Sequence, residues 1–254
     1  MASGPLTLIA LQTLPSVTVD TDLCGEILAA AEREGEKLRD GDILVVAQKV
    51  VSKAEGRLVA LSSLTPSPRA LALAEETGKE PELMEAILSE TKTVLRTRPG
   101  LVVVEHRLGH IMANAGIDRS NTGCGEDWVL LLPKDPDASA RALRREIGAR
   151  AGARIGVIVS DSFGRPWRFG TTGVAIGVAG PAMRLDRRGE PDRDGRALEV
   201  TEIGLADSLA AAAVLAMGEG AESRPVVIAR GLEWMESGQK AADGLRPASE
   251  DLFR

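Results

Sequence analysis

An apolar, β-branched run at residues 155–159 (IGVIV) ends abruptly in a polar, glycine-rich segment. The run has the composition of a strand buried inside a sheet. The residues that follow, 160–177 (SDSFGRPWRFGTTGVAIG), place an acid, two hydroxyl-bearing serines, two arginines and a tryptophan among several glycines. Polar groups in this density are costly to bury without partners. We therefore interpret the segment as the place where a core strand meets a functional site.

Composition narrows the function classes. The chain has 254 residues, 44% hydrophobic and 27% charged, which is typical of a soluble globular protein with one or two domains. A net charge of -6 argues against nucleic-acid binding. No apolar run is long enough to span a membrane, so no membrane association is expected. The two cysteines, Cys24 and Cys124, form neither a disulfide framework nor a metal pattern, which predicts a reducing, cytoplasmic location.

Helical and strand periods alternate irregularly along the chain. The segment 43–57 (ILVVAQKVVSKAEGR) is interpreted as a buried strand that ends in charge, and 184–200 as a hairpin or excursion. The remaining strands are expected at 6–11, 101–106, 128–133 and 225–230. The helices are expected at 23–38, behind the N-cap Asp22, and at 67–78, 81–91, 135–152 and 203–219.

The common nucleotide-binding and hydrolase motifs are missing from the sequence. No G-x-x-x-x-G-K-[ST] loop occurs, and no G-x-G-x-x-G follows a strand. The chain has only two histidines, which makes a zinc site built on imidazoles a poor fit. Ser162 lacks the G-x-S-x-G surroundings of a hydrolase nucleophile.

Three acid-bearing loops at strand ends are expected, at 114–123, 160–168 and 217–225. Carboxylate and hydroxyl oxygens are the ligands that Mg²⁺ and similar hard cations prefer. The candidate ligands are Asp118, Asp161, Ser162 and Glu219. Each has a simpler interpretation, as a turn residue, a helix cap or an exposed helix end. The metal interpretation gains weight because three separate segments carry the same chemistry.

Five segments together resemble one protein family. They are VVAQKVVSKAEGR, GHIMANAGIDRSN, LLLPKDPDASA, VSDSFGRPWRFGTTGVAIGVAG and EVTEIGLADSLAAAAVLAMGE with the following RPVVIARG. In this order they resemble the coenzyme F420-0:L-glutamate ligase family, from about Leu6 to Gly231. The resemblance implies an α+β fold with two sub-domains and mixed β-sheets, working as an intertwined homodimer. We expect the ligase domain to cover residues 1–236, followed by a C-terminal tail at 237–254.

The same resemblance implies a reaction. The family adds L-glutamate to F420-0 with GTP as co-substrate, and uses Mg²⁺ or Mn²⁺ with stimulation by K⁺. GTP would phosphorylate the carboxylate of F420-0, and the amino group of glutamate would attack the acyl phosphate, releasing GDP and phosphate. Metal ions and cationic side chains hold the phosphates in reactions of this kind.

Site residues follow from the resemblance position by position. The metal ligands would be Asp118, Asp161, Ser162 and Glu219. The nucleotide contacts would be Leu14, Pro15, Ser16, Val17, Gln48, Lys49, Lys53, Asn121, Met217, Gly218, Glu219, Gly220, Ala221, Glu222, Ser223 and Arg224. The catalytic group would be Asp161, Arg165 and Arg168, with the arginines facing the phosphodiester and carboxylates. The sequence VDTDL (19–23) departs from the family's usual GDDL, which leaves that end of the nucleotide site less defined.

Several alternatives stay open at this point. We interpret Lys49 and Lys53 as lying on one face of an extended strand. The alternative is that both are solvated surface lysines. Trp167 could stack on the deazaflavin ring of F420-0 or pack beneath its own loop. The chain could also be another nucleotide-dependent carboxylate–amine ligase with a different polyanionic acceptor, or a coenzyme-binding module without activity.

Overall fold

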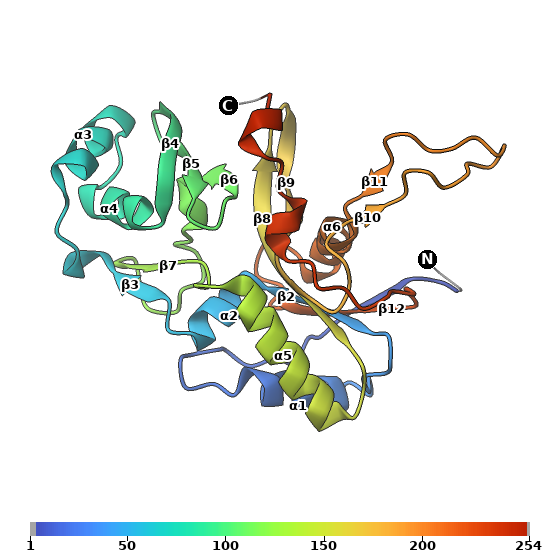
Figure 1. Cartoon of the computed structure of the whole chain (residues 1–254). Coiled ribbons are helices and arrows are strands. Elements are labelled where there is room, and N and C mark those ends of the chain that lie inside the picture. The colour runs from blue at the N-terminus through green and yellow to red at the C-terminus, as the bar shows by residue number, and fades with distance from the viewer. Residues whose placement is uncertain (1–3, 253–254) are drawn as a thin grey trace.

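A computed structural model describes residues 4–252, which form two lobes (Figure 1). The large lobe is built on a five-stranded sheet with the strand order β1-β12-β2-β8-β9. Its strands are β1 (Thr7–Ala10), β2 (Ile43–Ala47), β8 (Gly156–Arg165), β9 (Arg168–Ala179) and β12 (Val226–Arg230). β2 and β8 run parallel, and every other neighbouring pair in this sheet is antiparallel. The fold is therefore α+β with a mixed sheet, as expected.

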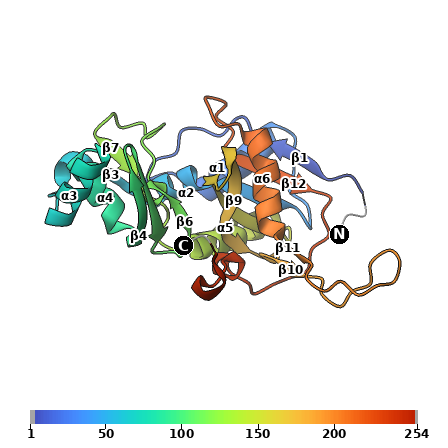
Figure 2. The same cartoon turned by 90° about the horizontal axis from the view of Figure 1, so that it is seen from above.

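Helices cover both faces of this sheet. Alternate strand residues point to opposite faces, so Val46 and Val159 belong to one apolar core, and Val45 and Ile158 to the other. The first core is closed by α1 (Leu23–Arg33), α2 (Gln48–Ala54) and α5 (Pro136–Ala151). The second is closed by α6 (Leu205–Met217), which lies against β9 (Figure 2).

The contact between β9 and α6 requires a glycine. A Cβ at Gly173 would lie 2.2 Å from the Ala210 carbonyl oxygen, so no side chain fits between strand and helix. Close packing here fixes the position of β9 and, through pairing, of the outer part of β8. The Gly-rich composition of 170–177 therefore serves helix–sheet packing as well as any ligand contact.

The small lobe has its own core. It contains the helices α3 (Pro68–Thr77) and α4 (Pro81–Ser89) and a three-stranded sheet of β4 (Thr91–Arg98), β5 (Leu101–His106) and β6 (Ile111–Ala113). Met84, Ile87 and Val104 are buried at its centre. The ladder of β3 (Leu58–Ala60) and β7 (Trp128–Leu130) connects it to the large lobe.

A buried acid fixes the base of the small lobe. Glu90 accepts hydrogen bonds at 2.9 Å from both Arg57 and Arg107, and its Oε2 lies 3.3 Å from His106 Nε2. Burial alone would raise the pKa of Glu90, but these three basic neighbours outweigh it and lower the pKa to about 2. The ionised carboxylate thus joins residues on both sides of the connection between the lobes.

Two further segments complete the described chain. The excursion after β9 forms a short ladder, β10 (Leu185–Asp186) with β11 (Glu202–Ile203), and a charged loop that projects from the large lobe (Figures 1 and 2). The segment after residue 236 carries short 3₁₀ turns, Ala241–Gly244 and Ala248–Glu250. Ser237 N donates to Gly180 O at 2.8 Å, and Ala241 N donates to the Asp137 carboxylate. The expected division at residue 236 stays a prediction.

Three sequence-based expectations need correction. The segment 43–57 is a strand only to Ala47 and then a helix, because Ala47, Val50, Val51 and Ala54 follow helical spacing. The polar segment after Ser160 is not a loop, since β8 continues to Arg165 and pairs with β9. β4 had no counterpart among the expected strands. Within residues 4–252, no helix combines the length and the apolar character needed to cross a membrane.

Candidate active site

Strand directions bring four chain segments to one edge of the large sheet. β2 and β8 are parallel, so both have their carboxyl ends at this edge, where Ala47 pairs with Ser160. β12 is antiparallel to β2, so the segment 217–225 enters here. β1 is antiparallel to β12, so residues 11–17 leave from the same edge. Segments distant in the sequence, including most of the expected site, thus meet at what we call the catalytic edge.

The expected metal ligands come from two of these segments and from the connection before β7. Asp161 and Ser162 follow the last β8 residue that pairs with β2. The Ser162 hydroxyl donates to Glu219 Oε1 at 2.6 Å, so the segment after α6 reaches β8. Asp118 is held beside β7 by a two-residue bridge to Leu130. The structure therefore brings the acids into one neighbourhood, although they come from separate elements.

The electrostatics of Asp161 reflect this gathering of acids. Burial, together with the nearby negative charges of Asp118 and Glu219, raises the pKa of the Asp161 carboxyl to about 7. A hydrogen bond from the Ser162 backbone and the charge of Lys49 act in the opposite direction without cancelling the effect. Perturbed acids of this kind cluster at functional sites. A cation placed among these carboxylates would relieve their repulsion.

The two expected phosphate-binding lysines lie on α2, which corrects the extended geometry inferred from the sequence. Lys49 and Lys53 are four residues apart in a helix and therefore share a face. Lys49 Nζ lies 2.5 Å from Asp118 Oδ2, and Lys53 Nζ donates to the Asn121 carbonyl oxygen at 2.5 Å. Burial and the positive charge of Lys49 lower the pKa of Lys53. Two ammonium groups held together in this way suit a polyanion such as a triphosphate.

Other residues that were expected to bind the nucleotide lie near the same edge. Gln48 is 1% exposed; its Oε1 accepts a bond from Ser52, while its Nε2 has no hydrogen-bond partner within the described chain. Val17 is buried in the same apolar core as Val50 and Val51 of α2. Pro225 O accepts from Ala47 N, so 217–224 ends beside the start of α2. An unpaired buried amide is costly, and a ligand would satisfy it.

The two expected catalytic arginines lie elsewhere. Arg165 and Arg168 flank the turn at the far end of the β8–β9 hairpin, four residues along β8 from Asp161. Arg165 Nη2 donates to the Phe169 carbonyl oxygen at 3.0 Å. The structure thus separates these arginines from the group of acids, and their part in catalysis stays a prediction.

Two contacts at this edge were not expected from the sequence. Ser120 links the lysine and acid chemistry, because its hydroxyl donates to Asp118 at 2.7 Å and accepts from Lys49 at 2.9 Å. His110 of the small lobe packs edge-on against Phe163, with ring centroids 5.6 Å apart. The D-x-S spacing of Asp118 and Ser120, typical of an Asx turn, was the available signal for the first. Nothing local signals the second.

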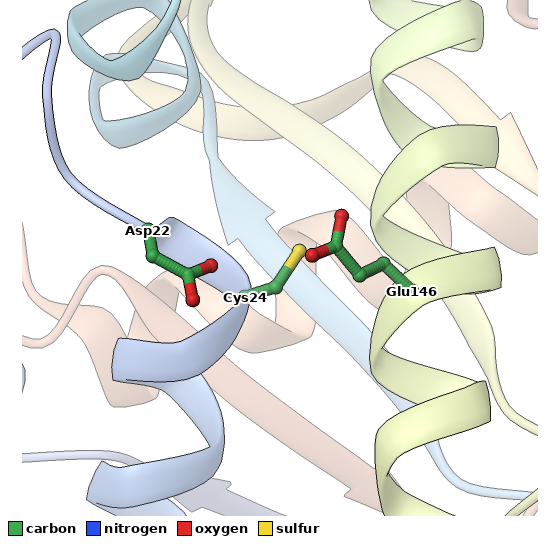
Figure 3. Close-up of side chains that lie close together, drawn as sticks. All are labelled: Asp22, Cys24 and Glu146. Carbon is green, nitrogen blue, oxygen red and sulfur yellow. The ribbon is translucent and has the colours of Figure 1, made fainter.

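A different cluster has metal-ligand chemistry but no need of an ion. Possible ligand atoms of Asp22, Cys24 and Glu146 lie within 4.8 Å of one another (Figure 3). Burial and the nearby Glu146 charge raise the pKa of the Cys24 thiol to about 11, so it stays protonated. Arg150 donates to both carboxylates, at 2.7 Å to Asp22. We interpret this cluster as a connection between α1 and α5.

The donor set at the catalytic edge does fit a divalent ion. Three carboxylates and a hydroxyl supply hard oxygen ligands, and only Lys49 balances Asp118 by direct contact. The carboxylates at this edge lie farther apart than the ligand atoms of the cluster around Cys24. Among residues 4–252, that cluster is the only group of three potential metal ligands within 4.8 Å of one another. Wider spacing suits ions that share their coordination with phosphate oxygens and water.

Comparisons with known proteins identify the family of this chain. The chain is similar to proteins called coenzyme F420:L-glutamate ligase, with 45% identity to that of Methanothermobacter thermautotrophicus over 98% of this chain and 99% of the relative. It is 46% identical to the Methanopyrus kandleri protein over 91% of this chain and 92% of that relative. It is 45% identical to the Halobacterium salinarum protein over 91% of this chain and 87% of that relative. The class of protein is therefore a ligase. Residues 12–231 match the model of F420-0:gamma-glutamyl ligase, and the chain belongs to that family.

Proposed function

We propose that this protein joins L-glutamate to F420-0 in a reaction driven by GTP. One observation carries the proposal: Asp118, Asp161 and Glu219 meet at the same sheet edge as Lys49 and Lys53. Acids that can hold a divalent cation beside paired lysines suit phosphoryl transfer from a nucleotide. Membership of the ligase family supplies the substrates that this chemistry would serve.

The proposed reaction has two steps. A carboxylate oxygen of F420-0 attacks the γ-phosphorus of GTP, the bond to the β-phosphate oxygen breaks, and GDP leaves. The amino group of glutamate then attacks the acyl carbon, loses a proton and expels inorganic phosphate, leaving an amide. Bound Mg²⁺ or Mn²⁺ would neutralise phosphate charge. Lys49 and Lys53 would hold the phosphates, Gln48 and 14–17 the nucleoside, and Asp118, Asp161, Ser162 and Glu219 the ions.

The direct test is product analysis. The purified protein is incubated with F420-0, GTP, L-glutamate and Mn²⁺, and the products are followed by mass spectrometry and GDP release. A mass increase of one or more glutamyl residues, dependent on all four components, is expected. GTP-dependent turnover with a folate-like acceptor alone would support a different ligase. Binding of F420-0 without GDP release would support a coenzyme-binding module. Parallel reactions with ATP, and with K⁺ replaced by Na⁺, test those two preferences.

The homodimer is part of the same proposal and rests on family membership. Light scattering at micromolar protein measures the mass directly, and a dimer of the 26.8 kDa chain is expected. A monomer mass under conditions that support turnover would remove the dimer from the proposal and leave the chemistry in place.

A further inference from the structure

The outer part of the β8–β9 hairpin projects beyond its sheet. β2 stops at Ala47, opposite Ser160, so β8 from Asp161 onward pairs only with β9. Residues 164–171 are all exposed. The hairpin rises between the small lobe and α6 (Figure 1). Its inner end carries Asp161 and Ser162, and its tip carries the turn at Pro166 and Trp167.

The tip concentrates exposed aromatic surface. The chain has only three tryptophans, three phenylalanines and no tyrosine. Trp167 is 79% exposed and Phe169 fully exposed, at the end of one hairpin. Trp167 therefore does not pack beneath its own loop, which was one of the two expectations. Neighbouring exposed aromatic rings indicate a surface that contacts another molecule.

The backbone at the tip is strained to present this ring. Pro166 and Trp167 are the two residues between β8 and β9, and Trp167 has φ 57°. After a proline in such a turn, glycine adopts positive φ without steric cost, whereas a bulky side chain is a rare outlier. Strain that a glycine would remove indicates that the indole ring has a use other than forming the turn.

Charge and length define what the tip can hold. Arg165 and Arg168 lie on either side of Trp167 in the chain, and Phe169 follows Arg168, so a planar ring bound here would meet cationic groups beside it. Arg165 lies four residues beyond Asp161 on β8, a distance of about 13 Å along the hairpin. A ligand that spans this distance needs a flat ring at one end, an anionic linker and a reacting carboxylate at the other. F420-0 has this order of groups: a deazaflavin, a phosphodiester and a terminal carboxylate.

We propose that the tip of the β8–β9 hairpin is the docking platform for the acceptor, with Trp167 stacking on the deazaflavin ring and Arg168 meeting the phosphodiester. The inference rests on the proposed function and adds to it the place where the acceptor is recognised. Phe169 extends the apolar surface on which the ring lies. The linker then follows the hairpin toward Asp161, where the acceptor carboxylate meets the nucleotide phosphates.

The test uses a substitution that removes the ring and relieves the turn. Trp167→Gly is expected to weaken F420-0 binding about 10- to 100-fold, the usual loss when an aromatic stacking partner is removed. Binding is measured by deazaflavin fluorescence without GTP, so no turnover is needed. The KM for F420-0 should rise in parallel, with kcat and the KM values for GTP and glutamate unchanged. The melting temperature should be equal to or higher than that of the wild type.

Two controls separate the ring from the charge. Met235→Ala removes another side chain that is 85% exposed, beyond the opposite edge of the sheet, and should leave F420-0 binding unchanged. A deazaflavin that lacks the phospholactyl group probes stacking alone. Trp167→Gly should weaken both ligands, whereas Arg168→Ala should weaken F420-0 and leave the deazaflavin without this group unaffected.

Each contrary outcome is diagnostic. Unchanged F420-0 affinity in Trp167→Gly overturns the platform, and a lowered melting temperature would mean that the ring serves folding. A change from dimer to monomer would mean that the tip contacts a second copy of the chain. Failure of the proposed function looks different: the wild-type protein would bind F420-0 at the tip without ligating glutamate.

Discussion

Acidic side chains at the two edges of the large sheet have neighbours of opposite charge. At the edge opposite the catalytic one, Asp42 precedes β2 and is 1% exposed. Arg230, at the end of β12, donates to both Asp42 oxygens at 2.9 and 2.8 Å and to Glu36 at 2.9 Å. At the catalytic edge, Asp161 has the acids Asp118 and Glu219 as neighbours. One edge is closed by ion pairs, and the other holds like charges together.

The shape of the surface alone would suggest a binding site at the edge with Asp42. A hollow of about 420 Å³ opens beside Asp42, lined by residues such as Arg39, Arg154 and Trp234. Several of its polar groups already have partners: Arg154 stacks on Trp234 at 4.5 Å, and the indole N–H donates to Gly41 O. Satisfied groups stabilise a fold, whereas groups that lack counter-charges can be used by a ligand. The comparison therefore favours a structural role for the edge with Asp42 and supports the proposed chemistry at the edge with Asp161.

The largest effect is expected from Asp161→Asn. The substitution keeps the shape of the side chain but removes an anionic ligand, so turnover should fall at least about a hundredfold. Because the native acids repel one another, the melting temperature should not fall. Steady-state GDP release and calorimetric melting measure the two quantities. Full activity in this variant, or in excess chelator, would remove the metal role.

The matched change at the other edge is Asp42→Asn. It leaves the Arg230 guanidinium without its buried counter-charge, and breaking such a pair costs about 3–5 kcal/mol of unfolding free energy. Urea denaturation measures the loss. Turnover per folded molecule should stay unchanged, since no contact of Asp42 reaches the catalytic edge. Equal losses of activity in Asp161→Asn and Asp42→Asn would contradict the different roles given to the two edges.

The contact of the small lobe with the catalytic edge should depend on pH. Burial and the nearby His106 lower the pKa of His110 from 6.5 to about 4, so the folded protein favours neutral imidazole. The unfolded chain takes up a proton below pH 6.5. The contribution of neutral His110 to the free energy of unfolding is therefore complete above pH 6.5. It is lost as the pH falls toward 4, and the loss amounts to about 3 kcal/mol at most. Urea denaturation at pH 7 and 4.5 measures it, and His110→Gln should flatten the dependence.

A smaller effect is expected from Lys53→Ala. Losing one charge-assisted phosphate contact should cost about 1.5–3 kcal/mol, or one to two decades in GTP affinity. Calorimetry with GTP measures this, and Lys37→Ala, an exposed lysine near the closed edge, is the matched control. If both variants bind GTP as the wild type does, Lys53 is a solvated surface lysine and the nucleotide lies elsewhere.

The sequence by itself determined most of the elements and the chemistry of the candidate site. Apolar spacing predicted α1, α3, α4, α5 and α6, and β-branched runs predicted β2, β5 and β12, because burial repeats with the period of each element. Spaced motifs identified the family, and the acids at 118, 161 and 219 were named from their donor chemistry. These features are local, so they can be read from neighbouring residues.

Only the tertiary structure decided how distant residues meet. Ser162 contacts Glu219 because strand directions bring separate segments to one edge of the large sheet. Lys49 contacts Asp118, which a bridge to Leu130 of β7 holds in place. The extension of β8 past Ser160 depends on its partner β9, which the polar composition concealed. Trp167 is exposed because the β8–β9 hairpin extends beyond the rest of its sheet. Contacts between distant segments depend on strand pairing and packing, which no local periodicity records.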